Sequence, residues 1–220
     1  MFWLIIIAVI VIFFIIRYIV ERPPTEEELA ARWAKEYVWT QDGNEGIKIT
    51  GYNGPAGYVR IPSKLDGLPV TSIEYGAFEQ KGLTIVDIPD GITSIGMNAF
   101  SRNELTKVYI PYSVITIDIQ AFHQNFLTEV TIPGIVKCIS INAFAYNELT
   151  EINIPNSDSN TLIMEKAFWS NMEVTSITIG ANVRLMDGSF AGAGNFEKAY
   201  DGKAGTYTRP NTSSSEWTRC

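Results

Sequence analysis

LTKVYIPYSVITIDIQAFHQN, residues 105–125, is a unit that the chain repeats. Residues 127–147, LTEVTIPGIVKCISINAFAYN, keep its leading leucine, its Val-x-Ile-Pro motif and its Ala-Phe pair, and the flanking segments repeat it less closely. Self-similarity at a fixed period of about 20 to 50 residues is typical of stacked repeat architectures. We therefore expect one elongated repeat domain.

Aligning the Ala-Phe pairs places a phenylalanine at one position of six successive units: Phe78, Phe100, Phe122, Phe144, Phe168 and Phe190. Neighbouring phenylalanines are 22 residues apart, except that residues 156–160 lengthen the fifth unit to 24. An aliphatic residue stands five positions before each of them: Ile73, Ile95, Ile117, Ile139, Ile163 and Leu185. Columns repeated six times indicate that every unit has the same structure.

Each unit contains two short extended pieces, such as residues 108–110 and 115–117. Alternation points Val108 and Ile110 inward, and Pro111 ends the first piece because proline cannot donate a ladder hydrogen bond. The Ala-Phe pair follows in a helical turn, with its ring in the centre. One unit cannot offset its own chain entropy, so neighbours must stack. The predicted fold is a β-rich repeat solenoid with short strands and helical turns.

An asparagine stands three residues after the phenylalanine in four units, at Asn103, Asn125, Asn147 and Asn171. We interpret this column as a structural ladder in which each amide bonds backbone groups of its turn and of the next coil. A ligand-binding asparagine ladder is the alternative. Lys81 departs from the column after Phe78.

The pattern Leu-Thr-x-Val-x-Ile-Pro-x-x-Val-Thr-x-Ile-x-x-x-Ala-Phe-x-x-Asn resembles the BspA-type leucine-rich repeats of bacterial surface proteins. The resemblance covers about residues 47–190, and residues 49–71 look like the usual opening segment of that family. It implies a curved leucine-rich repeat solenoid with a strand in each repeat, displayed outside the cell for adhesion or ligand contact. It does not imply an enzyme.

Residues 2–16 are apolar without a break, and the apolar stretch extends to residue 20 interrupted only by Arg17. About 20 helical residues span a bilayer core of roughly 30 Å. We expect one transmembrane signal-anchor helix over residues 1–20, in a single-pass membrane protein. The start lacks a basic residue and an Ala-x-Ala-like cleavage site, which favours an uncleaved anchor over a cleaved signal peptide.

The orientation of the anchor stays open. Arg17 and Arg22 follow the apolar run, and the positive-inside rule would place that side in the cytoplasm. The family resemblance instead implies an extracytoplasmic repeat domain, which is the orientation we expect.

Four segments result: the anchor at 1–20, a linker and capping helix at 21–46, about six repeats at 47–196, and a C-terminal cap or tail at 197–220. Thr25 and Glu28 form a capping box that predicts a helix from about residue 26 to 37. Its apolar face is expected to cap the open end of the stack. Tyr207 and Trp217 are expected to cover the last coil from a hairpin, with a disordered tail as the alternative.

Composition excludes several functions. The net charge of −7 and the lack of clustered Lys and Arg in the repeats argue against nucleic acid. Two cysteines, Cys138 and Cys220, are too few for a disulfide framework. The single histidine, His123, excludes a histidine-based metal cluster. Neither a cofactor fingerprint nor a nucleophile elbow is present, so we expect no cofactor.

The outward side chains of the first extended piece form two columns that face solvent. The candidate ligand face consists of Lys107, Tyr109, Glu129, Thr131, Glu151 and Asn153. Glu129 and Glu151 occupy equivalent positions about 5 Å apart if the strands pair, a spacing that superficially suits a retaining glycosidase. Two solvated glutamates on an open face are the favoured interpretation.

The first hypothesis for function is therefore a non-enzymatic, membrane-anchored repeat protein that binds a protein or glycan ligand. The second is an envelope scaffold or self-association module. An enzyme is the least favoured class, and the sequence does not name the ligand.

Overall fold

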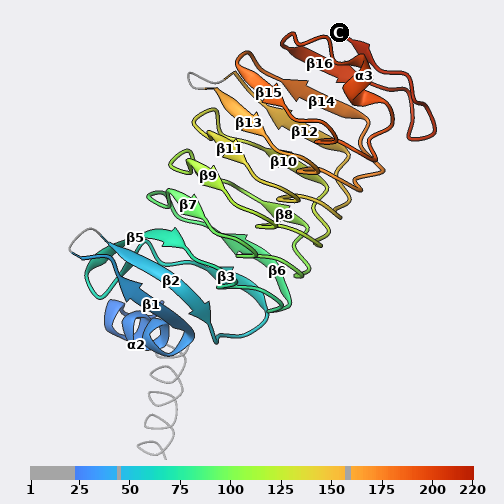
Figure 1. The fold of residues 1–220 in the computed structure, drawn as a ribbon. Coiled ribbons are helices and arrows are strands. Elements are labelled where there is room, and N and C mark those ends of the chain that lie inside the picture. The colour runs from blue at the N-terminus through green and yellow to red at the C-terminus, as the bar shows by residue number, and fades with distance from the viewer. Residues whose placement is uncertain (1–22, 44–45, 157–159) are drawn as a thin grey trace, which may run out of the picture.

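The computed structural model of the protein describes residues 23–43, 46–156 and 160–220. Each repeat forms one coil, and the coils stack in a row from the N-terminal helix to the C-terminal hairpin (Figure 1). Each turn of about 22 residues brings the chain back to the same side in the same direction, so equivalent strands of neighbouring coils pair in parallel.

One side of the described stack is a continuous sheet. Its strands in spatial order are β1 (Tyr37–Gln41), β2 (Ile47–Tyr52), β5 (Leu68–Ile73), β7 (Ser94–Ile95), β9 (Thr116–Ile117), β11 (Cys138–Ile139), β13 (Thr161–Ile163) and β15 (Val183–Leu185). β4 (Lys64–Leu65) pairs antiparallel with β5 beside this path.

A second side is built from two shorter sheets. The first contains β3 (Gly57–Arg60), β6 (Leu83–Asp87) and β8 (Lys107–Val108), and the second contains β10 (Glu129–Thr131), β12 (Glu151–Ile154), β14 (Ser176–Ile179), β16 (Gly205–Thr208) and β17 (Thr218–Arg219). The two sheets adjoin at β8 and β10, where the Thr128 N–H donates to the Thr106 carbonyl at 3.4 Å. Val108, Val130 and Ile152 point inward and are buried, as strand alternation requires.

The Ala-Phe turns carry the core. The six phenylalanine rings are fully buried or nearly so, with neighbouring centroids 4.9 to 5.3 Å apart and ring planes within 14° of parallel. Each offset ring pair contributes about 0.5 to 1.5 kcal/mol beyond its burial. The residues before Ala and two after Phe have positive φ, as at Gln120 and Gln124, and glycine takes both places in the last coil, at Gly188 and Gly192.

The asparagine column lies beside these rings and joins neighbouring coils. Asn125 Nδ2 donates to the carbonyls of Phe100 (3.0 Å) and Phe122 (3.1 Å), and Asn125 Oδ1 accepts from the Leu105 N–H (3.1 Å). Asn103, Asn147 and Asn171 repeat this arrangement. Backbone groups that two coils would leave unpaired inside the stack are thereby satisfied.

The N-terminal end is covered by the antiparallel pair β1–β2. Tyr37 and Tyr52 are buried, and the Tyr52 ring lies 5.2 Å from the Phe78 ring, so the row of aromatic rings continues into the cap. The helix α2 (Glu26–Glu36) begins with the expected capping box, in which the Thr25 N–H donates to the Glu28 carboxylate at 2.8 Å.

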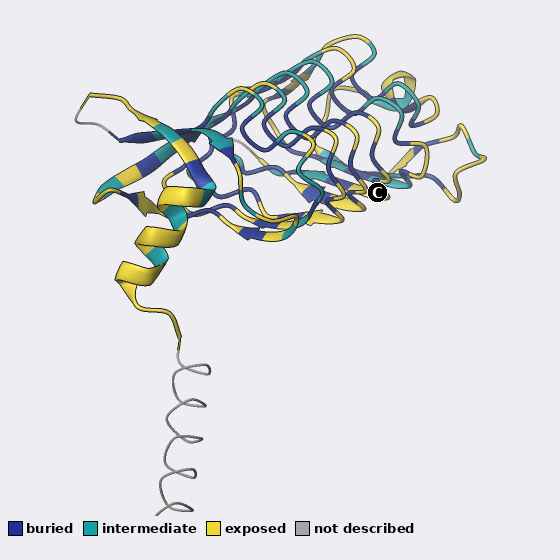
Figure 2. Cartoon of the chain, turned by 90° about the horizontal axis from the view of Figure 1, so that it is seen from below, coloured by how far each residue is buried: buried dark blue, intermediate teal, exposed yellow. Residues whose placement is uncertain are grey.

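The prediction that the apolar face of this helix caps the stack holds only in part: Trp33 packs against the buried core, but the β1–β2 pair covers the end. None of its residues is buried, and Figure 2 shows it standing largely exposed outside the hairpin. Leu29 and Trp33 are half-buried and line hollows on both sides of the helix. No strand was predicted before residue 47. The structure has β1 there, directly after the helix, and its first residue, Tyr37, covers the end of the stack.

The predicted transmembrane helix is also not supported. Residues 1–20, on which that prediction falls, lie outside the described residues. Within the described ranges, no helix is both long enough and apolar enough to cross a bilayer.

The C-terminal end is covered by β16 and β17, which pair antiparallel, and by the short helix α3 (Phe196–Ala199). Tyr207 and Trp217 are buried and pack edge-on against the Phe196 ring, which packs edge-on against Phe190. The buried Arg209 guanidinium donates to four backbone carbonyls, including those of Val174 and Met172 in the last coils. This arginine fastens the hairpin to the stack.

At the C-terminal end, a glutamate accepts the hydrogen bonds that a following coil would accept. In earlier coils the phenylalanine N–H donates to a carbonyl of the following coil, as Phe122 donates to Ala143 at 2.8 Å. At the last coil the Phe190 N–H donates to Glu197 Oε1 (2.7 Å), and the Gly188 N–H donates to Glu197 Oε2 (3.0 Å). One carboxylate therefore satisfies two N–H groups that have no further coil to bond.

We expect Asn125→Ala to lower the free energy of unfolding by about 3 kcal/mol, because it leaves buried backbone groups of two coils without partners. Thermal denaturation followed by circular dichroism measures this loss. The matched control is Asn53→Ala, which removes an exposed asparagine and should leave the melting temperature unchanged. Equal melting temperatures for the two variants would contradict the structural role.

We expect Glu197→Gln to lower the free energy of unfolding by about 1 kcal/mol, because the amide keeps one acceptor oxygen but turns an NH₂ group toward the second backbone N–H. Faster hydrogen exchange at Gly188 and Phe190 should accompany the loss. Glu216→Gln removes the same charge from an exposed position of the hairpin and serves as the control. Unchanged exchange at both amides would refute this assignment.

Candidate functional site

The candidate ligand face is a set of outward side chains on three neighbouring strands. We call it the strand face: Lys107 on β8, Tyr109 just after β8, Glu129 and Thr131 on β10, and Glu151 and Asn153 on β12. The register pairs Glu129 with Glu151 and Thr131 with Asn153, so the two predicted columns run across the strands. Parallel pairing of equivalent positions places all six on one side of the stack.

An ion pair crosses the junction between the two sheets. Lys107 Nζ lies 2.7 Å from Glu129 Oε1, and both side chains are more than half exposed. Such a pair contributes little to stability, but it fixes the positions of one donor and one acceptor group. Glu129 stands opposite Glu151 on β12, so Lys107 contacts it from the other side of that carboxylate pair.

Two tyrosines form the exposed aromatic part of this region. The side chains of Tyr109 and Tyr112 are 63% and 67% exposed. Together with Lys107, Glu129 and Thr131 they border a shallow hollow of about 290 Å³. Glu151 and Asn153 lie on the next strand and do not line it.

The asparagine column, the histidine and the cysteines lie elsewhere. The four asparagines are buried in the turns and bond backbone. His123 is buried against the edge of the Tyr146 ring, and burial, with a smaller contribution from the Arg102 charge, lowers its pKa. Cys138 is half-buried and Cys220 is exposed, both as free thiols. Among the described residues, no three His, Cys, Asp or Glu side chains gather closely enough to hold a metal ion.

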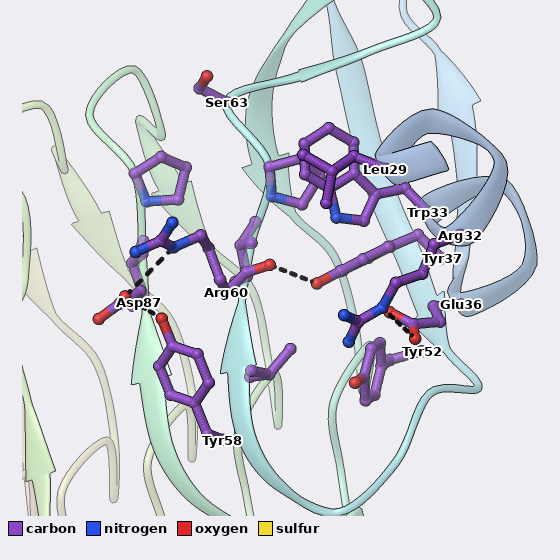
Figure 3. A pocket seen from close by; sticks show the side chains of 15 residues that line it. Leu29, Arg32, Trp33, Glu36, Tyr37, Tyr52, Tyr58, Arg60, Ser63 and Asp87 are labelled. Carbon is purple, nitrogen blue, oxygen red and sulfur yellow. Dashed lines mark hydrogen bonds and ion pairs between the residues drawn. The ribbon is translucent and has the colours of Figure 1, made fainter. Parts of the chain in front are cut away.

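A larger hollow lies between α2 and the sheet formed by β3, β6 and β8. We call it the helix cavity: about 620 Å³, lined by residues 29–37 in part, by Tyr52, by residues 58–63 and by residues 87–89 (Figure 3). Its walls therefore come from the helix, the N-terminal cap and the ends of β3 and β6. No residue of the strand face lines it.

Polar contacts hold both walls of the helix cavity. On the helix, Arg32 Nε lies 2.7 Å from Glu36 Oε1. On the sheet, the Tyr58 hydroxyl donates to Asp87 Oδ2 at 2.5 Å, and Arg60 Nε lies 3.6 Å from the same oxygen (Figure 3). The hydrogen bond from Tyr58 to Asp87 is the main cause that raises the pKa of Tyr58.

One hydrogen bond connects the cap to the sheet across this cavity. The Tyr37 hydroxyl donates to the Arg60 carbonyl at 2.7 Å. Burial raises the pKa of Tyr37 far above its ordinary value, so the phenol remains a donor. This contact fixes β1, which directly follows the helix, against β3.

Sequence reasoning missed this cavity. It identified an apolar face on the helix but assigned that face to capping. Tyr58 and Arg60 alternate with the buried Val59 on β3, and this alternation was the available signal that both point outward. That these two side chains line the same cavity as helix residues has no sequence signature, because it depends on the path of the chain through β1 and β2.

Known proteins resemble this chain in sequence and fold. The sequence signature described as BspA type leucine-rich repeat region matches six copies over residues 71–197. A leucine-rich repeat protein of T. pallidum is 28% identical, with a TM-score of 0.60 over 66% of this chain and 69% of that one. A leucine-rich repeat protein of Bacteroides ovatus, 22% identical over 68% of this chain and 41% of its own, shares the fold with a TM-score of 0.52. No curated protein matches the sequence.

Three observations indicate the same family: the repeat columns, the parallel coils and the signature match over more than half of the sequence. The chain belongs to the BspA-type leucine-rich repeat family.

Proposed function

We propose that the protein is a non-enzymatic, protein-binding repeat protein of the bacterial cell surface, and that it contacts its partner through the strand face. The observation that carries the proposal is the exposure of Tyr109 and Tyr112 beside the Lys107–Glu129 ion pair. Tyrosine buries a large area at low entropy cost and is enriched among residues that dominate protein interfaces.

The scaffold supports this role. β8 pairs with β6, β10 pairs with β12, and β12 also pairs with β14, so backbone hydrogen bonds order each strand of the face before a partner arrives. Preorganised side chains lose less entropy on binding. The paired charges at the junction would favour one orientation of the partner rather than add much affinity.

Adhesion to a host or matrix ligand is the use that the family resemblance favours. An envelope scaffold and self-association are the alternatives, and they differ from adhesion only in the identity of the partner. An enzyme is the least favoured class, because Glu129 and Glu151 lie side by side on an open strand face and Glu151 does not line the hollow that Glu129 borders.

A photo-crosslinking phenylalanine in place of Tyr109 should capture a discrete partner on intact cells, whereas the same group in place of Tyr75 should not. Tyr75 is a matched control because its side chain is 66% exposed but lies in a turn away from the strand face. Mass spectrometry identifies the partner: matrix proteins support adhesion, and envelope proteins or a second copy support scaffolding.

With that partner in hand, Tyr109→Ala should weaken binding at least about tenfold, because truncating an aromatic residue central to an interface costs about 2 kcal/mol. Equal capture from positions 75 and 109, or an unchanged affinity of the Tyr109→Ala variant, would exclude the strand face as the contact surface.

A further inference from the structure

We infer that the helix cavity is a second binding site, and that it takes a neutral oligosaccharide. The site shares no residue with the strand face, and the inference stands on its own observations: the shape of the cavity, its balanced charges, its paired donors and acceptors, and its aromatic walls.

The helix cavity has the size and lining of a small-ligand site. A volume of about 620 Å³ lies within the range of about 300 to 1,000 Å³ found for small-ligand sites. Leu29 and Trp33 supply apolar surface on the helix wall, and polar groups stand on both walls (Figure 3). An apolar lining with a few convergent polar groups is the usual composition of such sites.

The charges cancel within the cavity. Arg32 is paired with Glu36 at 2.7 Å, and Arg60 with Asp87 at 3.6 Å, so two guanidinium groups face two carboxylates. An anionic ligand would gain one guanidinium but meet the adjoining carboxylate, and a cationic ligand would meet the reverse. This arrangement therefore favours a ligand without net charge.

The polar groups also match hydroxyls. Arg32 donates its Nε–H to Glu36 at 2.7 Å, whereas Arg60 Nε lies 3.6 Å from Asp87, too far for a hydrogen bond, and each guanidinium carries further N–H donors. A hydroxyl accepts and donates at once, so one hydroxyl can accept from a guanidinium while it donates to the adjoining carboxylate. Adjacent hydroxyls on a sugar ring present this combination repeatedly, whereas carboxylates and phosphates only accept.

Aromatic rings supply the apolar surface that a sugar ring needs. Trp33 stands on the helix wall, and Tyr58, whose side chain is 51% exposed, stands on the sheet wall. Asp87 fixes the Tyr58 ring through a 2.5 Å hydrogen bond, so its orientation is set before binding. The C–H face of a sugar packs favourably against such a flat ring.

A peptide added as a strand fits the site less well. β3 is the edge of its sheet, and a free edge is a template for strand addition. However, the Tyr37 hydroxyl already donates to the Arg60 carbonyl at 2.7 Å and occupies that part of the edge. A peptide strand would have to displace a buried tyrosine, whereas a saccharide would not.

Isothermal titration of the full chain tests the inference with four neutral hexasaccharides as probes: cellohexaose, chitohexaose, mannohexaose and xylohexaose. Hexagalacturonic acid and a hexaproline peptide are the competing classes. We expect at least one neutral probe to bind with a Kd below about 1 mM and to bind at least tenfold more tightly than either competitor.

Asp87→Asn and Arg60→Gln should each weaken that binding at least about tenfold, because each removes one group of the donor–acceptor pair. The Asp87 and Arg60 side chains are exposed by 52% and 73%, so both variants should keep the wild-type melting temperature. Tyr109→Ala on the strand face is the control and should leave saccharide affinity unchanged, so the two binding sites can fail independently.

Three results would overturn the inference. These are no detectable binding of any neutral hexasaccharide, tighter binding of the acidic saccharide or the peptide, or saccharide affinity unaltered in both Asp87→Asn and Arg60→Gln.

Discussion

The structure depends on one side-chain amide that recurs in four of the six Ala-Phe-type turns. Asn125 donates to the phenylalanine carbonyls of two successive coils and accepts the N–H of Leu105, so it joins the coils at the place where their backbones cannot pair directly. The amide has two donors and an acceptor in one plane, which serine or aspartate lacks. Its position beside the phenylalanine rings also keeps these bonds away from water, so each bond keeps its full strength.

That constraint explains the ends of the molecule, where the repeating interaction stops. At the first coil, Asn103 still reaches back to the carbonyl of Phe78, and tyrosines of β1 and β2 replace a further phenylalanine. At the last coil, the Glu197 carboxylate and the buried Arg209 guanidinium bond backbone groups that a further coil would otherwise have bonded. The helix cavity exists because the N-terminal cap is not a repeat: α2 and β1 depart from the stack and leave a hollow against β3.

The sequence alone predicted the repeat, its register and the side of the strands on which Lys107 and Glu129 lie, because periodic columns report periodic structure. It also predicted the start of α2, since Thr25 and Glu28 act locally. It failed where the pattern ends. β1 has no counterpart in the columns, and neither the bonds of Glu197 to the last coil nor the contact of Tyr37 with Arg60 follows from local spacing. The predicted membrane helix at residues 1–20 found no support. The sequence columns that predicted the strand face did not predict the helix cavity.

Because of the Glu197 carboxylate, the same C-terminal cap can close a stack with any number of coils. It receives two N–H groups that every coil presents in the same places, so the terminal module recognises a general feature of the coil rather than one particular sequence. A chain that gained or lost a 22-residue unit upstream would present the same two groups to the same cap. Duplication or deletion of a coil is therefore structurally inexpensive in this architecture, and the extent of the outer surfaces can change in evolution while the ends stay constant.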